Sequence, residues 1–109
     1  MTDTLKVLGQ ITPAATTITT LYTVPAATQT TTSSLIVCNL SVSTATFNIS
    51  VAIGGASDTP AQYIYSGTSL DASDTFVAQL GLSLAATDVV RVFASATGLS
   101  FNLFGVEIT

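Results

Sequence analysis

The stretch Thr46-Phe47-Asn48-Ile49-Ser50-Val51-Ala52-Ile53 places an apolar side chain at every second position. Successive side chains of an extended chain point to opposite faces, so the apolar residues from Phe47 to Ile53 share one face. Asn48 and Ser50 lie on the other face. The pattern predicts a half-buried β-strand.

The same period of two recurs on both sides of this stretch. Further strands are expected at 5–10, 17–24, 34–40, 62–66, 76–80, 89–94 and 99–104. Turn signals rich in Pro, Gly and Asp separate them. About eight short antiparallel strands predict an all-β protein, a single β-sandwich domain over residues 1–109 of jelly-roll or immunoglobulin-like type. Residues 1–10 are expected to serve as a docking arm as well.

Charge is scarce in this chain. Of 109 residues 48% are hydrophobic and 7% charged, with a net charge of -4. Lys6 and Arg91 are the only cations, too few to neutralise a phosphate backbone, so nucleic acid is not an expected partner. Apolar runs are too short to cross a bilayer, and no signal peptide is recognised. We therefore expect synthesis in a cytoplasm and no membrane contact.

Residue types needed for most catalysis are missing. The absence of His excludes a His-containing triad or a His-ligated zinc site. The lone Cys38 is expected on a core face as a small apolar residue, since no neighbouring base is available to activate it. We expect a protein that is not an enzyme and that carries no cofactor and no metal.

The acidic residues sit near turns. Asp58, Asp71, Asp74 and Asp88 do not follow a calcium-loop pattern, and Asp commonly stabilises turns, so we expect that role. Residues 70–77 and 84–91 share one form: a Leu, a tight turn, then an Asp before a strand.

Two predicted hairpins assign the faces of four strands. One joins 89–94 to 99–104 through a turn at 95–98 and sets Val90, Val92 and Ala94 against Leu103, Phe101 and Leu99. The other spans 36–51 and sets Ile36, Cys38 and Leu40 against Val51, Ile49 and Phe47.

The opposite faces of these hairpins are also apolar. Two explanations compete for these apolar faces: loops or termini of the same chain cover them, or the faces contact another subunit. The scarcity of charge in the chain favours the subunit contact. The interface candidates are Leu35, Val37, Val89, Phe93 and Phe104. Tyr63 and Tyr65 are predicted on the same side of a short strand, where they belong to the core or an interface, or form a platform for a sugar ring.

Several segments together resemble a known family. They are Leu21-Tyr22-Thr23-Val24-Pro25-Ala26, the strand with Val37-Cys38-Asn39, and the closing Gly105-Val106-Glu107-Ile108. Over about 21–108 the chain resembles small virion structural proteins of tailed phages, including those of cyanobacterial hosts. The resemblance implies a β-sandwich that assembles as a symmetric oligomer on the particle, with no catalytic residues.

These observations lead to three functional hypotheses. The first is a capsid decoration or cement subunit in the virion, a homotrimer that binds the major capsid protein or other virion proteins and stabilises the particle. The second is a tail, neck, baseplate or fibre subunit with the same fold. The third is a glycan-binding module that uses Tyr63 and Tyr65.

Overall fold

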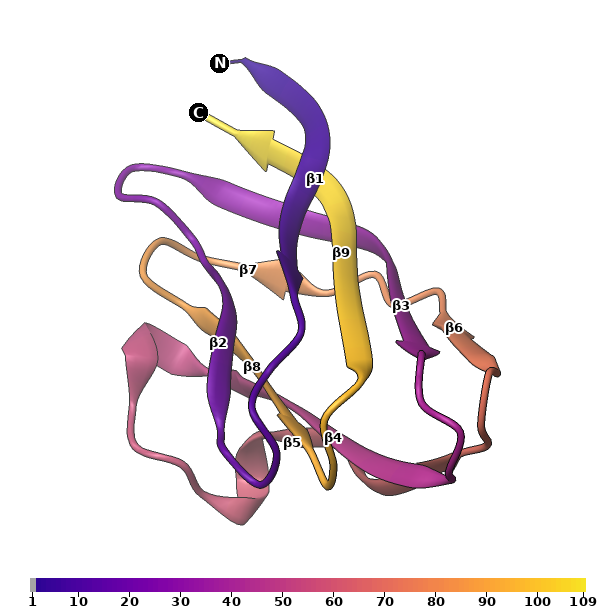
Figure 1. Cartoon of the computed structure of the whole chain (residues 1–109). Helices are drawn as coiled ribbons and strands as arrows, with labels where there is room; N and C mark the ends of the chain where they lie inside the picture. Colours follow the sequence, from indigo (N-terminus) through magenta and orange to yellow (C-terminus); the bar gives the residue numbers. More distant parts are fainter. Residues whose placement is uncertain (1) are drawn as a thin grey trace.

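The computed structural model describes residues 2–109, which form two antiparallel sheets (Figure 1). Sheet A has the strand order β1-β9-β3-β6, with β7 also paired to β3, and sheet B has the order β2-β8-β4-β5. The strands are β1 (Asp3–Ile11), β2 (Thr19–Thr23), β3 (Gln29–Asn39), β4 (Ala45–Ala52), β5 (Tyr63–Leu70), β6 (Thr75–Ala78), β7 (Ser83–Leu84), β8 (Val89–Ala94) and β9 (Leu99–Ile108). Within 2–109 no helix has the length and apolar character needed to cross a membrane.

The pairing follows a simple rule: the first half of the chain pairs with the second half in reverse order. β4 pairs with β5, β3 with β6 and β7, β2 with β8, and β1 with β9, all antiparallel. The chain is thus one long hairpin wound into two layers, which is a jelly roll. The predicted β-sandwich is confirmed, and the strand order selects the jelly roll over the immunoglobulin-like alternative.

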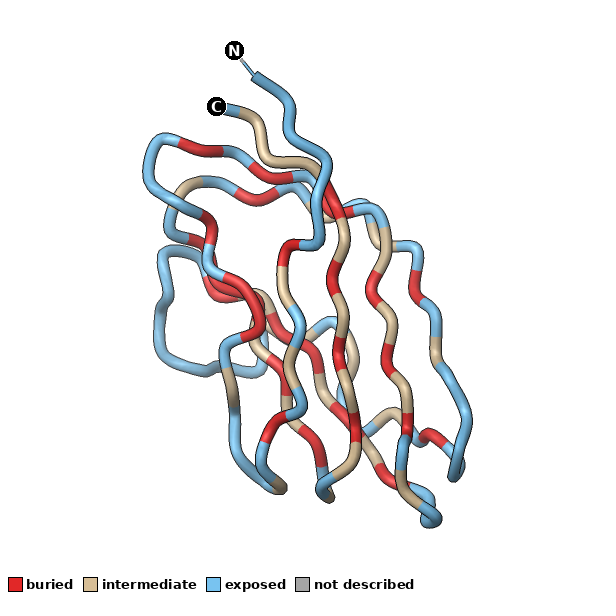
Figure 2. The backbone as a smooth tube through the Cα atoms, turned by 45° about the horizontal axis from the view of Figure 1, so that its top comes forward, coloured by how far each residue is buried: buried red, intermediate tan, exposed pale blue. Residues whose placement is uncertain are grey.

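The core lies between the two sheets. Phe47 of sheet B and Phe101 of sheet A are both fully buried, and their ring centroids lie 6.0 Å apart in an edge-to-face arrangement. Phe76 packs on Phe47 with a centroid distance of 5.3 Å. Figure 2 shows buried and less buried residues alternating along the strands. This alternation is the predicted period of two, with one face of each strand turned to the core.

Neither predicted hairpin forms a ladder. β8 and β9 belong to different sheets, as do β3 and β4, so the loops 95–98 and 40–44 cross from one sheet to the other. The two loops contact each other through a hydrogen bond from the Leu40 N–H to the Gly98 carbonyl oxygen, 2.7 Å. The core face predicted for 89–94 and 99–104 is nevertheless buried, because the two strands face each other across the core.

The predicted faces of β3 are reversed. Leu35 and Val37, expected to point outward, are 1% and 0% exposed in the core. Cys38, expected in the core, is partly exposed on the outer face, and Leu40 is 67% exposed. β3 pairs Leu35 with Leu103 and Val37 with Phe101. Since both faces of this strand are apolar, hydrophobic alternation alone did not determine its orientation.

The two similar turn segments have the same backbone conformation. Ser73 and Thr87 both adopt positive φ, 60° and 71°. In each turn the next residue, Asp74 or Asp88, donates its N–H to the carbonyl oxygen three residues earlier, at 3.1 and 3.2 Å. The carboxylate of Asp88 also accepts the N–H groups of Ala85 and Gly54, and that of Asp74 accepts the N–H of Thr75. The turn-stabilising role predicted for these two residues is confirmed.

Candidate interaction surface

The outer face of sheet A carries apolar side chains on four strands, with polar residues such as Ser34 and Asn102 between them. Along β9 the core-facing residues alternate with outward-facing Phe104, Val106 and Ile108. The ladder sets Val7 beside Phe104 and Leu5 beside Val106. Toward the other edge Ile36 of β3 lies beside Val77 of β6. The surface is formed by Leu5, Val7, Ile36, Val77, Phe104, Val106 and Ile108.

Several of these side chains are open to solvent. Leu5 is 83% exposed, Val77 58% and Val7 46%, and the remaining four are partly exposed. Isolated exposed apolar residues are ordinary, but seven of them on four adjacent strands form the kind of patch that marks an interaction site. Lys6 and Glu107 point to the inner side of the same strands, whereas Asp3, beside Ile108, lies on the outer face.

The outer face of sheet B is different, because the chain covers part of it. After β4 ends at Ala52, the segment 53–62 folds back over this face. The Arg91 guanidinium donates to the carbonyl oxygens of Ala56 and Gly55, at 2.7 and 3.0 Å, and holds the segment in place. Val89, predicted to be an interface residue, is 8% exposed here. Its apolar side chain is covered by a loop of the same chain, the alternative left open above.

Only one predicted interface residue lies on the outer face of sheet A. That residue is Phe104, which pairs with Val7 and Ser34. Phe93 is half-buried on the outer face of sheet B, opposite Asn48. Leu35 and Val37 are core residues. Sequence reasoning missed Ile36 because it placed the β3 outer face in the core, and it missed Val77 because it assigned no face to residues 76–80.

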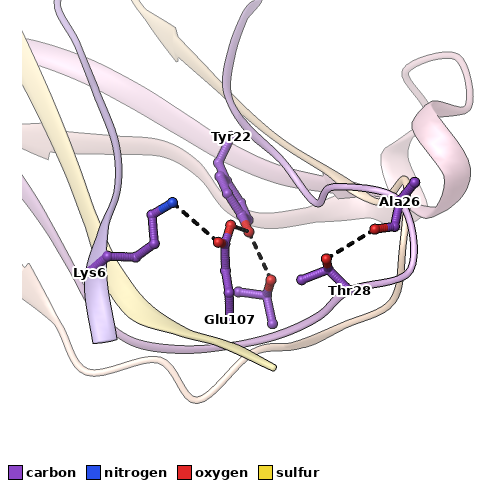
Figure 3. Close-up of polar contacts among 6 residues, drawn as sticks. Lys6, Tyr22, Ala26, Thr28 and Glu107 are labelled. Carbon is purple, nitrogen blue, oxygen red and sulfur yellow. Dashed lines mark hydrogen bonds and ion pairs between the residues drawn. The ribbon is translucent and has the colours of Figure 1, made fainter. Parts of the chain in front are cut away.

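A polar cluster joins the two sheets where β1 and β9 extend toward the chain ends (Figure 3). Tyr22 of β2 donates its hydroxyl to Oε2 of Glu107 on β9, 2.6 Å, and lies 2.8 Å from Oγ1 of Thr30 on β3. Lys6 of β1 forms an ion pair of 3.2 Å with Oε1 of Glu107. Nearby, the Thr28 hydroxyl bonds to the Ala26 carbonyl oxygen, 3.1 Å. Three strands of sheet A and one of sheet B are thereby linked.

The cluster shifts the acid–base behaviour of its members. Burial, together with the hydrogen bond to the Glu107 carboxylate, raises the pKa of Tyr22 to about 12. The hydrogen bond from Tyr22 lowers the pKa of Glu107, and Lys6 lowers it further. Both shifts favour a neutral phenol that donates to a charged carboxylate. The sequence did hold a signal, since Glu107 is the only glutamate and Lys6 one of two cations in the chain.

Residues 3–10 of the predicted docking arm belong to a strand. They form most of β1, which is paired with β9 along its length. Gly9 is packed so closely against Leu21 of β2 that a Cβ there would overlap the Leu21 carbonyl oxygen. Met1, the first residue of the predicted arm, lies outside the described residues.

The two tyrosines of the predicted sugar platform have different environments. A register shift of β5 sets Tyr65 beside Ile49 and Tyr63 beside Ser50. The Tyr65 ring packs edge-on against Phe76, 5.2 Å between centroids, at the border of the core. The Tyr63 hydroxyl donates to Oδ2 of Asp58, 2.8 Å, on the covering segment. The expected placement of both rings on the same side is therefore wrong.

No cluster of acidic, Cys or His side chains able to hold a metal is found among residues 2–109. An open hollow of about 500 Å³ lies between the turns near the C-terminal end. Its lining carries no ionisable side chain and consists of Ala27, Thr28, Gln29, Ala85, Ala86, Ile108 and Thr109. The hollow thus offers no side chain for acid–base chemistry.

The fold and the uncovered face define the chain as a jelly-roll β-sandwich with exposed apolar side chains on one face. No protein-family model matches the chain, and no curated protein matches it either.

Proposed function

We propose that this protein is a non-enzymatic structural subunit of a phage virion, of the capsid decoration or cement type. The observation that carries the proposal is the uncovered apolar face of sheet A, in a chain with 7% charged residues. In this role the face docks on capsid shell proteins and ties neighbouring subunits together. Burial of apolar surface then adds to the stability of the particle.

Two further arguments support a structural role. Jelly rolls recur in viral capsid proteins, although the same fold also occurs in lectins and cupins, so this support is an analogy of fold. The resemblance of residues 21–108 to small phage virion proteins points in the same direction. The tail, neck or baseplate alternative uses the same surface and differs in the number of copies on the particle.

The test is a count of bound copies. The gene is deleted from the phage that carries it, purified protein is added back to the particles, and bound copies are counted by quantitative mass spectrometry. Hundreds of copies per particle support the capsid role, and a handful to a few dozen indicate the tail. Absence of binding, together with absence of the protein from wild-type particles, refutes a virion role.

Two matched variants test the surface. Val77→Asp places a charge on the outer face of sheet A, where Val77 is 58% exposed, and is expected to abolish binding. Leu40→Asp places the same charge at a similarly exposed apolar residue in the loop 40–44 and should bind like the wild type. Equal binding of both variants would contradict the assignment of this face.

A further inference from the structure

β1 is an edge of sheet A with free backbone groups. Thr2 and Thr109 exchange two hydrogen bonds, N–H of Thr2 to the Thr109 oxygen at 2.7 Å and the reverse at 2.9 Å. Bonded and non-bonded pairs alternate along an antiparallel ladder, so Thr4 and Lys6 also bond to β9. The N–H and C=O groups of the residues between them, at positions 3, 5 and 7, therefore point toward the open edge.

This edge has little of the usual protection against pairing with another strand. Edges are commonly shielded by charged side chains, Pro, bulges or short strands. β1 contains no Pro, and its Lys6 is engaged with Glu107 on the inner side. Its other charged residue, Asp3, lies at the N-terminal end of the strand. Leu5 and Val7, 83% and 46% exposed, stand on the outer side. A register shift occurs only after Val7, so the stretch 3–7 is regular.

The other sheet edges are less suited to pairing. β6, at the far side of sheet A, has four residues, and β2 has five with a register shift between Thr20 and Tyr22. β5 is interrupted by two register shifts. Residues 3–7 of β1, on the N-terminal side of the Gly9–Leu21 contact, are the longest regular free edge among the described strands.

We propose that β1 pairs antiparallel with β1 of a second copy, about a two-fold axis centred on Leu5. The axis lies perpendicular to the sheet, so outward side chains of both copies stay on the same face. Each residue therefore pairs with a partner residue whose number differs from its own by zero or by an even number. Centring on Leu5 places it beside the partner's Leu5 and sets Asp3 beside the partner's Val7. In this register the residues at positions 3, 5 and 7, whose backbone groups point outward, all form hydrogen-bonded pairs with the second copy. An axis centred on Thr4 or Lys6 would pair only two of them.

Charge also selects this register. Centring on Lys6 sets two ammonium groups directly opposite each other, which destabilises a strand pair. With Leu5 at the centre, Lys6 lies beside the partner's Thr4. The strands β1, β9, β3 and β6 of the two copies become one continuous sheet, and the outer faces of sheet A join into one apolar surface.

The contact is small, which sets the expected affinity. Five residues of strand span about 17 Å, and this pairing buries less than the roughly 800 Å² per partner of a standard interface. We therefore expect a dissociation constant in the micromolar range. The contact is two-fold, so it predicts a dimer in solution rather than the homotrimer of the capsid decoration hypothesis. It holds whether or not the protein is part of a virion.

The first experiment measures mass by sedimentation equilibrium from micromolar to hundreds of micromolar protein. The wild type is expected to reach the mass of two 11.1 kDa chains. Leu5→Lys sets two ammonium groups against each other and should raise the dissociation constant about tenfold or more. Val7→Lys, the matched control, sets its ammonium beside the partner's Asp3 and should still dimerise. Circular dichroism verifies that both variants fold.

The second experiment measures amide hydrogen exchange at low and high protein concentration. The Leu5 and Val7 amides are expected to exchange rapidly in the monomer and to be protected in the dimer. The Thr4 and Lys6 amides, bonded to β9, should be protected at both concentrations. A monomer at all concentrations, an unchanged dissociation constant in Leu5→Lys, or a dimer with unprotected Leu5 amides overturns the proposal.

Discussion

The cluster around Tyr22 gives a quantitative prediction for Tyr22→Phe, which removes one hydroxyl and little else. The lost hydrogen bond to the Glu107 carboxylate is 2.6 Å long, and a bond to a charged group contributes about 1.5–3 kcal/mol. The Thr30 hydroxyl, 1% exposed, also loses this partner. We expect a loss of about 2.5 kcal/mol in the free energy of unfolding, or about 10 °C in Tm for a chain of this length.

The assay is thermal and urea unfolding at pH 7, followed by far-UV circular dichroism at one fixed protein concentration. Tyr63→Phe is the matched control, since its hydroxyl also bonds to a carboxylate, at 2.8 Å from Asp58, but at the surface. It should change stability by less than about 0.5 kcal/mol. Adding Thr30→Val to Tyr22→Phe removes the buried hydroxyl and should recover about 1 kcal/mol.

The acid limb of the stability curve tests the same reasoning. The pKa of Glu107 is lowered in the folded state, so its contribution is present above the pKa of the unfolded chain and is lost as pH falls through the folded value. Tyr22→Phe removes the main cause of that shift and should flatten this loss. A Tyr22→Phe variant as stable as Tyr63→Phe at pH 7, with an unchanged acid limb, would refute the role assigned to the cluster.

Three further predictions concern stability. Gly9→Ala should destabilise the fold by about 2 kcal/mol or more, because its Cβ would overlap a carbonyl oxygen of β2. The control Gly81→Ala has open space around it and should be nearly neutral, and urea unfolding measures both. Asp88→Ala removes a carboxylate that accepts two backbone N–H groups and should lower the free energy of unfolding by about 2 kcal/mol. The control Asp71→Ala removes an exposed carboxylate with a single hydrogen bond of 3.5 Å and should lower it by less than about 0.5 kcal/mol. The pKa of Tyr22 is raised from 10.0 to about 12 in the folded chain, so the unfolded chain loses this proton first as pH rises. The free energy of unfolding should therefore fall between pH 10 and pH 12, and the fall should be smaller in Tyr22→Phe.

The sequence predicted strand positions well and strand partners poorly. The period of two located 89–94 where β8 lies, and it found each of the other main strands. β3, β5 and β9 extend four or five residues beyond the predicted ranges. Pairing failed because neighbouring strands were assumed to form hairpins, whereas a jelly roll sends β3 to β4 and β8 to β9 across the core. Alternation also did not orient β3, where Leu35 and Ile36 are equally apolar.

Of the five predicted interface residues, only Phe104 lies on the outer face of sheet A, and whether this face binds a partner stays a prediction. The loop that covers Val89 depends on Arg91 reaching Gly55 and Ala56, a contact between distant segments. The cluster of Tyr22 and Glu107 joins residues 85 positions apart. Such contacts follow from the winding of the chain, which no local pattern in the sequence specifies.

The reverse-order pairing has a consequence for how the chain folds. The β4–β5 ladder closes the shortest loop, and each later ladder joins strands farther apart, until β1 meets β9 almost a full chain length away. Loop-closure entropy favours assembly from the middle outward, with slow folding because most contacts are nonlocal. The β1–β9 ladder is then the last to close, and partial opening of the native state is expected to begin at the chain ends.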